Sequence, residues 1–194
     1  MTGIAPYVKK YIEETKSTLL DGYLTEGISK IVAVLLKARK AGRTIFFFGN
    51  GGSASTASHF VVDIGKGTMH GDRRRFRCLA LVDNVESVTA WANDMEYSRV
   101  FSEQLVGLAQ RGDVAVAISG SGNSPNVLRA VEAAHLLGLT TIGLTGMGGG
   151  RLKELADISI VVPSTSMQHI EDVHLLICHL LTAYLRDEVP APTA

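Results

Sequence analysis

Two parts of the sequence carry imidazole and carboxylate groups at spacings that suit proton transfer or metal binding. His59 and Asp63 lie four residues apart in a segment that predicts a helix, so both side chains fall on one face of it. Glu171 and His179 lie in an apolar helical segment near the C-terminus. A histidine in such a segment can equally be a core or interface residue, and the residues alone leave both interpretations open.

Two glycine- and serine-rich segments each follow an apolar, strand-like run and precede a helix. Residues 49–53 (GNGGS) follow the run at 44–48, and residues 119–124 (SGSGNS) follow the run at 114–118. Free backbone amides and the dipole at a helix N-terminus favour an anion, and serine hydroxyls add donors. Glycine and serine also cap helices and turn corners without binding a ligand. Two such loops at the ends of two strands of one sheet favour an anion site.

Neither loop has the pattern of a nucleotide-binding site. The first lacks the glycine in the sixth place of a dinucleotide fingerprint, and neither has the lysine of a nucleotide P-loop. We therefore expect a phosphate group without a nucleotide. A third glycine-rich segment, at 146–150, has a hydroxyl only at the neighbouring Thr145, and we interpret it as structural.

The segments that must position these residues alternate between strands and helices. Short apolar runs predict buried strands at 44–48, 78–82, 114–118, 141–144 and 158–162. Helix-length segments span 53–66, 84–93, 97–110, 124–137, 150–155 and about 168–187. This alternation predicts an α/β fold with a parallel sheet covered by helices on both faces, in which ligands bind at the carboxyl ends of the strands.

The N-terminal part, residues 1–42, predicts a pair of helices over 4–40, divided at Asp21-Gly22 and stopped at Gly42. The apolar face of this pair must be buried on the main domain or on a neighbouring subunit. We expect one domain over 1–194, made of the helical pair, an α/β core at 43–187 and a proline-containing tail at 188–194.

The composition excludes several classes of function. The 194 residues include 19 lysines and arginines and 19 aspartates and glutamates, so no net charge recruits nucleic acid or a membrane surface. The basic run at 73–77 is interpreted as a solvated or interface edge. Two distant cysteines fit a reducing compartment, and from the residue pattern we expect neither a signal peptide nor a membrane-spanning segment. We expect a soluble, cytoplasmic protein.

The order and spacing of these motifs resemble the sugar isomerase (SIS) domain and, within it, the phosphoheptose (sedoheptulose 7-phosphate) isomerase family. The matching stretches are Gly49–Ser53 with His59-Phe60, Ala92–Asp94, Ile118–Ser124, Leu144–Gly146 and Glu171–His179. The resemblance implies a flavodoxin-like fold with a five-stranded parallel sheet flanked by helices. It also implies a homotetramer, assembled through the two N-terminal helices, with active sites between subunits.

The resemblance further implies a role for particular residues. The residues that match phosphate-holding positions of the family are Ser53, Ser119, Ser121 and Ser124. Asn50 and Asp94 match positions that contact the sugar, and the substrate site also includes Gly51, Gly52, Gly120, Gln168 and Glu171. The family's metal positions, for which zinc is expected, align with His59, Asp63, Glu171 and His179. Asp63 would move the carbon-bound proton and His179 would act as its partner.

One distance argues for ligands from two subunits. Glu171 and His179 are separated along one helix by a rise of roughly 12 Å at 1.5 Å per residue. Both side chains would have to stretch to reach the same ion, and a ligand supplied by another subunit would relieve this.

Several positions depart from the pattern of the family. Asp63 stands where a glutamate is usual, and Glu171 replaces a glutamine. Gln168 replaces an aspartate, Gly120 replaces a threonine, and Lys66 lies beside the position of a family arginine. These departures indicate an active isomerase with an altered preference for substrate or metal.

The sequence therefore favours an aldose–ketose isomerase that interconverts sedoheptulose 7-phosphate and D-glycero-D-manno-heptose 7-phosphate through an enediol. Two alternatives stay open. One is an isomerase of another sugar phosphate. The other is a non-catalytic SIS module that binds a sugar phosphate or a replication-initiation protein.

Overall fold

The fold is built on five parallel strands. The computed structural model describes residues 3–19 and 21–187, so the predicted tail at 188–194 lies outside the described residues. The strands are β1 (Thr44–Gly49), β2 (Arg77–Ala80), β3 (Val114–Ser119), β4 (Thr140–Thr145) and β5 (Ile158–Val161). Their order in the sheet is β2-β1-β3-β4-β5, which is the flavodoxin-like order. The predicted five-stranded parallel sheet is confirmed.

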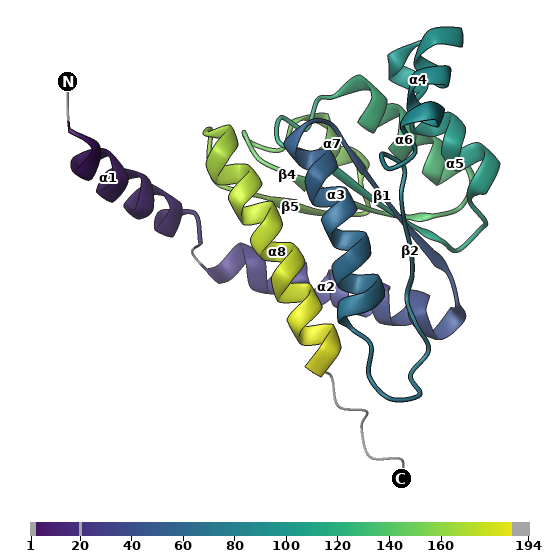
Figure 1. Ribbon diagram of the computed structural model, residues 1–194, viewed down its shortest axis with the longest axis horizontal. Coiled ribbons are helices and arrows are strands. Elements are labelled where there is room, and N and C mark those ends of the chain that lie inside the picture. The colour runs from purple at the N-terminus through teal and green to yellow at the C-terminus, as the bar shows by residue number, and fades with distance from the viewer. Residues whose placement is uncertain (1–2, 20, 188–194) are drawn as a thin grey trace.

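Helices cover both faces of this sheet (Figure 1). One face carries α2 (Asp21–Ala41), α3 (Gly52–Val62) and α8 (Met167–Asp187), with α3 and α8 side by side. The other face carries α5 (Ser102–Leu108), α6 (Pro125–Leu136) and α7 (Gly150–Leu155). Between β2 and α5 the chain forms α4 (Val85–Asp94) and the 3-10 turn η2 (Tyr97–Arg99).

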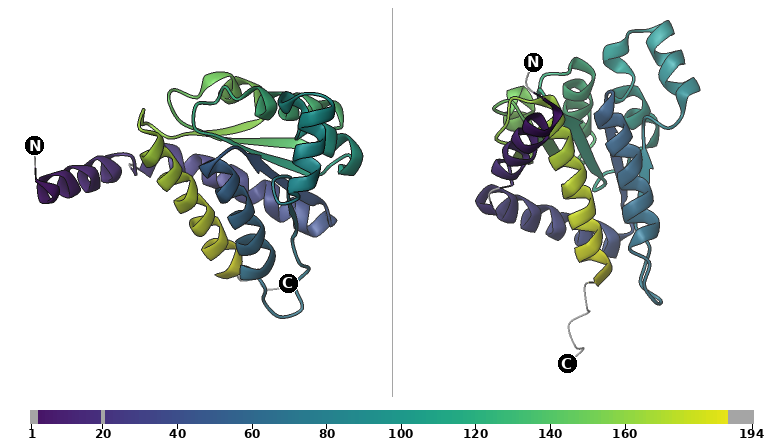
Figure 2. Two further views of the ribbon diagram at one scale, coloured as in Figure 1. Left: turned by 45° about the horizontal axis from the view of Figure 1, so that its top comes forward. Right: turned by 60° about the vertical axis from the view of Figure 1, so that its left-hand side comes forward.

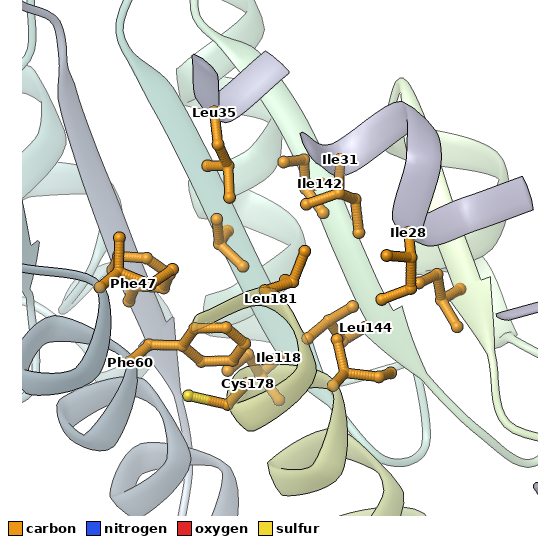
Figure 3. Close-up of a cluster of buried hydrophobic side chains, with 14 of the residues drawn as sticks. Ile28, Ile31, Leu35, Phe47, Phe60, Ile118, Ile142, Leu144, Cys178 and Leu181 are labelled. Carbon is orange, nitrogen blue, oxygen red and sulfur yellow. The ribbon is translucent and has the colours of Figure 1, made fainter. Parts of the chain in front are cut away.

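The strand sequences supply the core on both faces. Successive side chains of a strand point to opposite faces, so Phe47 of β1 joins the α2/α3/α8 side, while Phe46 and Phe48 join the α5/α6/α7 side. On the first side, the ring of Phe47 stacks on that of Phe60 in α3, with their centroids 5.1 Å apart. Figure 3 shows this cluster, in which α3, α8 and α2 meet over the sheet.

Two of the predicted helices differ from those observed. The segment predicted at 53–66 is α-helical to Val62 and then forms a π-helical turn, η1 (Asp63–Gly67). The single helix predicted at 97–110 is wrong, because the chain turns between η2 and α5. Val100 and Phe101 lie at that turn and are almost fully buried, which draws the backbone toward the sheet and interrupts the helix.

The N-terminal helix α1 (Ile4–Ser17) projects away from the rest of the molecule (Figures 1 and 2). It has no buried residue, and Ile4, Tyr7, Val8 and Ile12 are exposed. It contacts α8 through Tyr11, whose hydroxyl donates to Asp172 Oδ2 at 2.7 Å. The apolar face of α1 is therefore largely uncovered in a single chain.

Crossing a membrane requires a helix that is both long and apolar. No helix within residues 3–19 and 21–187 meets both requirements.

His174 of α8 is buried under the end of β4. Its Nε2 lies 3.3 Å from the carbonyl oxygen of Thr145, and because a carbonyl can only accept, this nitrogen carries the hydrogen. Burial, which the bond to Thr145 offsets only in part, lowers the pKa of His174 to about 4. The imidazole is therefore neutral at physiological pH and serves packing.

The contact between Phe47 and Phe60 predicts a large effect on stability. We expect Phe60→Ala to lower the free energy of unfolding by about 3–5 kcal/mol, because it leaves a cavity in a close-packed core. Leu136→Ala is the control: that side chain is 91% exposed, and its loss should change stability by no more than about 0.5 kcal/mol. Urea unfolding measures both, and equal effects would contradict this account of the core.

The burial of His174 predicts a dependence of stability on pH. The pKa of the imidazole is lower in the folded chain than in the unfolded one, so the unfolded chain binds more protons as the pH falls below about 6.5. The stabilisation is fully present above that pH and is lost as the pH falls toward 4. Between pH 7 and pH 5, we expect the free energy of unfolding to fall by about 2 kcal/mol less in His174→Gln than in the natural chain. The same loss in both chains, measured by urea unfolding, would contradict it.

Candidate functional site

The first predicted anion loop joins β1 to α3. Gly51 has a φ of 55°, in the left-handed region, which turns the chain sharply into the helix. The first amides of α3, those of Gly52 and Ser53, precede the helix's own hydrogen-bond ladder and are available to a ligand. A Cβ at Gly52 would lie 2.4 Å from a carboxylate oxygen of Glu171, so any larger residue here would displace the Glu171 side chain.

The second predicted anion loop joins β3 to α6. Its Ser119 and Ser124 hydroxyl oxygens lie 3.1 Å apart across the loop, and Pro125 then opens the helix. Gly120 faces α8, where a Cβ would come within 2.4 Å of Met167 Sδ. Met167 thus occupies the space that a side chain at position 120 would need.

These two loops meet in one pocket, because β1 and β3 are neighbours and both end at the same edge of the sheet. The pocket has a volume of about 240 Å³. It is lined by Asn50, Gly51, Gly52, Ser53, Ile118, Ser119, Gly120, Ser121, Ser124, Met167 and Glu171. The structure thus brings together every predicted substrate-binding residue except Asp94 and Gln168.

Those two residues lie outside the lining of the pocket. Asp94 ends α4, and its carboxylate accepts a hydrogen bond from the neighbouring Asn93 amide. Gln168, in the first turn of α8, accepts a 3.3 Å hydrogen bond from the Ser166 hydroxyl. Their contacts with a substrate stay predictions.

The third glycine-rich segment holds the second loop in place. The Gly146 amide donates to the Gly120 carbonyl at 3.0 Å, and the Leu152 amide donates to the Gly122 carbonyl at 2.9 Å. The Arg151 amide donates to Asn123 Oδ1 at 3.1 Å. Amides of Gly146 and of α7 (Gly150–Leu155) therefore donate to backbone and side-chain oxygens of the second loop, in agreement with a structural role for residues 146–150.

Asn50 is held by two residues that the sequence analysis did not single out. The amides of Asn50 and Asn126 donate to each other's oxygens, both at 2.9 Å. The Tyr97 hydroxyl donates to the same Asn50 oxygen, also at 2.9 Å. With Oδ1 accepting twice and one N–H used, Asn50 retains an N–H for a ligand in the pocket. Asn126 follows the second glycine- and serine-rich loop by two residues, which makes it a candidate by position, but its contact with Asn50 and the position of Tyr97 follow from tertiary packing.

His59, Asp63 and His179 form a second cluster farther along α3 and α8. The two Nε2 atoms of the histidines lie 3.2 Å apart, and Asp63 Oδ2 lies 3.4 Å from His59 Nε2 and 3.9 Å from His179 Nε2. The side chain of Asp63 is 25% exposed, and those of His59 and His179 are 44% and 54% exposed. The structure therefore brings together three of the four predicted metal ligands on an accessible face.

This cluster has the chemistry and the spacing of a metal site. Its donor atoms all lie within 4.8 Å of one another. Tetrahedral bonds of about 2.0–2.1 Å from zinc to nitrogen or oxygen place neighbouring ligand atoms about 3.3 Å apart, close to the separations observed. Two imidazole nitrogens that face each other need a proton or a cation between them. Two histidines and one carboxylate can thus hold a divalent metal ion and leave one position open.

Glu171 does not join this cluster in the described part of the chain. Its carboxylate lies beside Gly52 on the serine-lined pocket, about two helical turns before His179 along α8. This separation agrees with the expectation that Glu171 and His179 of one helix would both have to stretch to reach the same ion. A role of Glu171 as a fourth ligand stays a prediction.

The two cysteines take no part in this chemistry. Both are free thiols, and burial raises the pKa of Cys78 to about 12. Burial, with a smaller contribution from the nearby Asp63 carboxylate, raises the pKa of Cys178 to about 12. Both thiols are therefore protonated near neutral pH, although Cys178 directly precedes His179.

The chain was compared with known proteins. It matches the family model of the SIS domain over residues 9–146. It is 37% identical to the phosphoheptose isomerase of Aliarcobacter butzleri, over 94% of this chain and 96% of that protein. It is 42% identical to the phosphoheptose isomerase of Nitratiruptor sp., over 78% of this chain and 81% of that protein.

A solved structure extends the agreement to three dimensions. The phosphoheptose isomerase GmhA from Neisseria gonorrhoeae matches with a TM-score of 0.88 and 29% identity, over 96% of this chain and 100% of that one. Family model, sequence relatives and architecture agree over most of the chain. The chain therefore belongs to the SIS-domain family and, within it, to the phosphoheptose isomerases.

Proposed function

We propose that this chain interconverts sedoheptulose 7-phosphate and D-glycero-D-manno-heptose 7-phosphate through an enediol. The observation that carries the proposal is the placement of two complementary sites along the same pair of helices. The serine-lined pocket lies at the start of α3 and α8, and the His59–Asp63–His179 cluster lies farther along both. One extended substrate can therefore reach both sites.

The separation of these sites suits a long sugar phosphate. Along α3, the rise from Ser53 to His59 is roughly 9 Å at 1.5 Å per residue. With its phosphate between the serines of the pocket, a seven-carbon chain can reach toward the cluster, whereas a three-carbon chain falls short. The remaining N–H of Asn50 can donate to an oxygen of the phosphate or the sugar.

Isomerisation needs one proton to move between adjacent carbons. In our proposal, Asp63 takes the proton from C2 of the aldose, and the electrons of that bond form the C1–C2 double bond of the enediol. His179 gives a proton to the carbonyl oxygen on C1 and takes one from the hydroxyl on C2. Asp63 then returns its proton to C1, which gives the ketose. The short side chain of Asp63 requires the sugar to lie close to α3.

We propose that the cluster also holds a divalent metal ion, with zinc as the expected one. His59, Asp63 and His179 would each hold it through one atom, which leaves the second carboxylate oxygen of Asp63 and the second ring nitrogen of His179 to move protons. Glu171 is a further ligand only if its side chain moves or comes from another subunit. When bound, the ion supplies a positive charge that stabilises negative charge on the substrate oxygens.

We further propose a homo-oligomer, with a tetramer as the expected form. The apolar side chains that α1 leaves exposed support it. Val62, Leu180 and Tyr184 are also exposed, on the same two helices as the metal cluster. A second copy that covered these side chains would enclose the cluster, so the active sites would lie between subunits. The two free thiols fit the proposed cytoplasmic location.

The proposed chemistry predicts a specific loss in one variant. We expect the purified protein to convert sedoheptulose 7-phosphate to the aldose, and His179→Ala to lower kcat by about 10²–10⁴-fold, because it removes a proton-transfer group. The same variant should hold less metal, measured by elemental analysis. The control is His135→Ala, because His135 contacts Thr141 at the opposite edge of the sheet.

Two outcomes would contradict these assignments. Turnover that His179→Ala leaves unchanged removes His179 from its role. No turnover of any sugar phosphate tested, with and without added zinc, and no bound metal would contradict the enzymatic proposal. Tight binding of a sugar phosphate without turnover would then favour a non-catalytic module.

The pocket predicts a different kinetic change. We expect Ser121→Ala to raise KM by about tenfold with little change in kcat, because a contact to the phosphate stabilises the bound substrate and the transition state alike. Ser29→Ala, on the exposed side of α2, is the matched control. Steady-state kinetics measures both constants, and a fall in kcat with an unchanged KM would contradict a phosphate contact.

A further inference from the structure

The charge of the serine-lined pocket is unusual for a site that holds an anion. Its lining contains hydroxyls, amides and glycines, but no lysine, arginine or histidine among the described residues. The one charged side chain in the lining is the carboxylate of Glu171. A phosphate in this pocket would therefore be held by neutral donors beside a negative charge.

The carboxylate of Glu171 lies at the start of α3, where a bound anion would also lie. A Cβ built on Gly52 would lie 2.4–2.5 Å from Oε1, Cδ and Oε2 of Glu171, so the carboxylate packs against the first residue of α3. The N-terminus of a helix is also where an anion is favoured. Within the described residues, the Glu171 carboxylate makes no hydrogen bond or ion pair that would offset its charge.

We propose that Glu171 lowers the affinity of the pocket for a phosphate group, so that free phosphate binds weakly. The inference rests on the proposed function, since it takes the pocket as the phosphate site. Two negative charges at short range repel more strongly in a partly desolvated pocket than in water. Inorganic phosphate makes no contacts outside the pocket with which to overcome that repulsion. A sugar phosphate gains contacts along α3 and α8, so binding depends on the sugar.

Calorimetry of inorganic phosphate with the full-length protein tests this at low ionic strength. We expect Glu171→Gln and Glu171→Met to lower the Kd for phosphate by about tenfold or more, because both remove the charge and keep a chain of similar length. The gain should shrink between about 50 mM and about 500 mM salt, since salt screens charges. Asp172→Asn is the matched control: it removes a neighbouring carboxylate that does not line the pocket, and its Kd should stay within about twofold.

Three other results would overturn the inference. A gain in Glu171→Gln alone would assign the effect to a new amide donor rather than to charge. An unchanged Kd in both Glu171 variants, with thermal unfolding showing that they are folded, would show that the carboxylate does not oppose phosphate. If neither phosphate nor sedoheptulose 7-phosphate binds to any of these proteins, the phosphate site itself fails, and the proposed function fails with it. Turnover enters none of these measurements.

Discussion

The site depends on one constraint, which is that β1 and β3 run parallel as neighbours in the sheet. Their carboxyl ends therefore lie at one edge, and the two loops that leave them face each other although they are far apart in sequence. The order β2-β1-β3 places this pair where the sheet changes direction of winding, which is where ligands bind in such folds. The backbone amides at the starts of α3 and α6 then need no side chain to attract an anion.

The second constraint is the packing of α3 against α8. Phe60 of α3 and Cys178 of α8 lie in the same buried cluster over the sheet (Figure 3), which fixes the two helices side by side. His59 directly precedes Phe60, and His179 directly follows Cys178. The buried neighbours hold the two histidines at the exposed side of the pair, where their nitrogens meet. The packing of the core and the geometry of the His59–Asp63–His179 cluster are thus set by adjacent residues.

The sequence predicted the strands and the two loops well, because apolar runs followed by glycine and serine are local signals. The pair His59 and Asp63 was predictable for the same reason, since four-residue spacing is a property of one helix. The link between Asn50 and Asn126, 76 residues apart, and the position of Tyr97 depend on tertiary packing that no local pattern records. Glu171 was expected both in the substrate site and as a metal ligand; the packing of α8 on Gly52 places it on the pocket, while its role as a ligand stays a prediction.

The π-helical turn after α3 has a consequence for how such chains vary in length. Because η1 begins at Asp63, the carboxylate keeps its four-residue relation to His59, and only the backbone after it is wound more widely. A π turn contains one residue more than the α-helical turn it replaces. A deletion of one residue within 64–67 would return the segment to regular helix, because the extra residue is taken up within the turn, and would leave both the pair and the direction of the following loop in place. Insertions and deletions in the connection to β2 are therefore separable, in evolution, from the chemistry at His59 and Asp63.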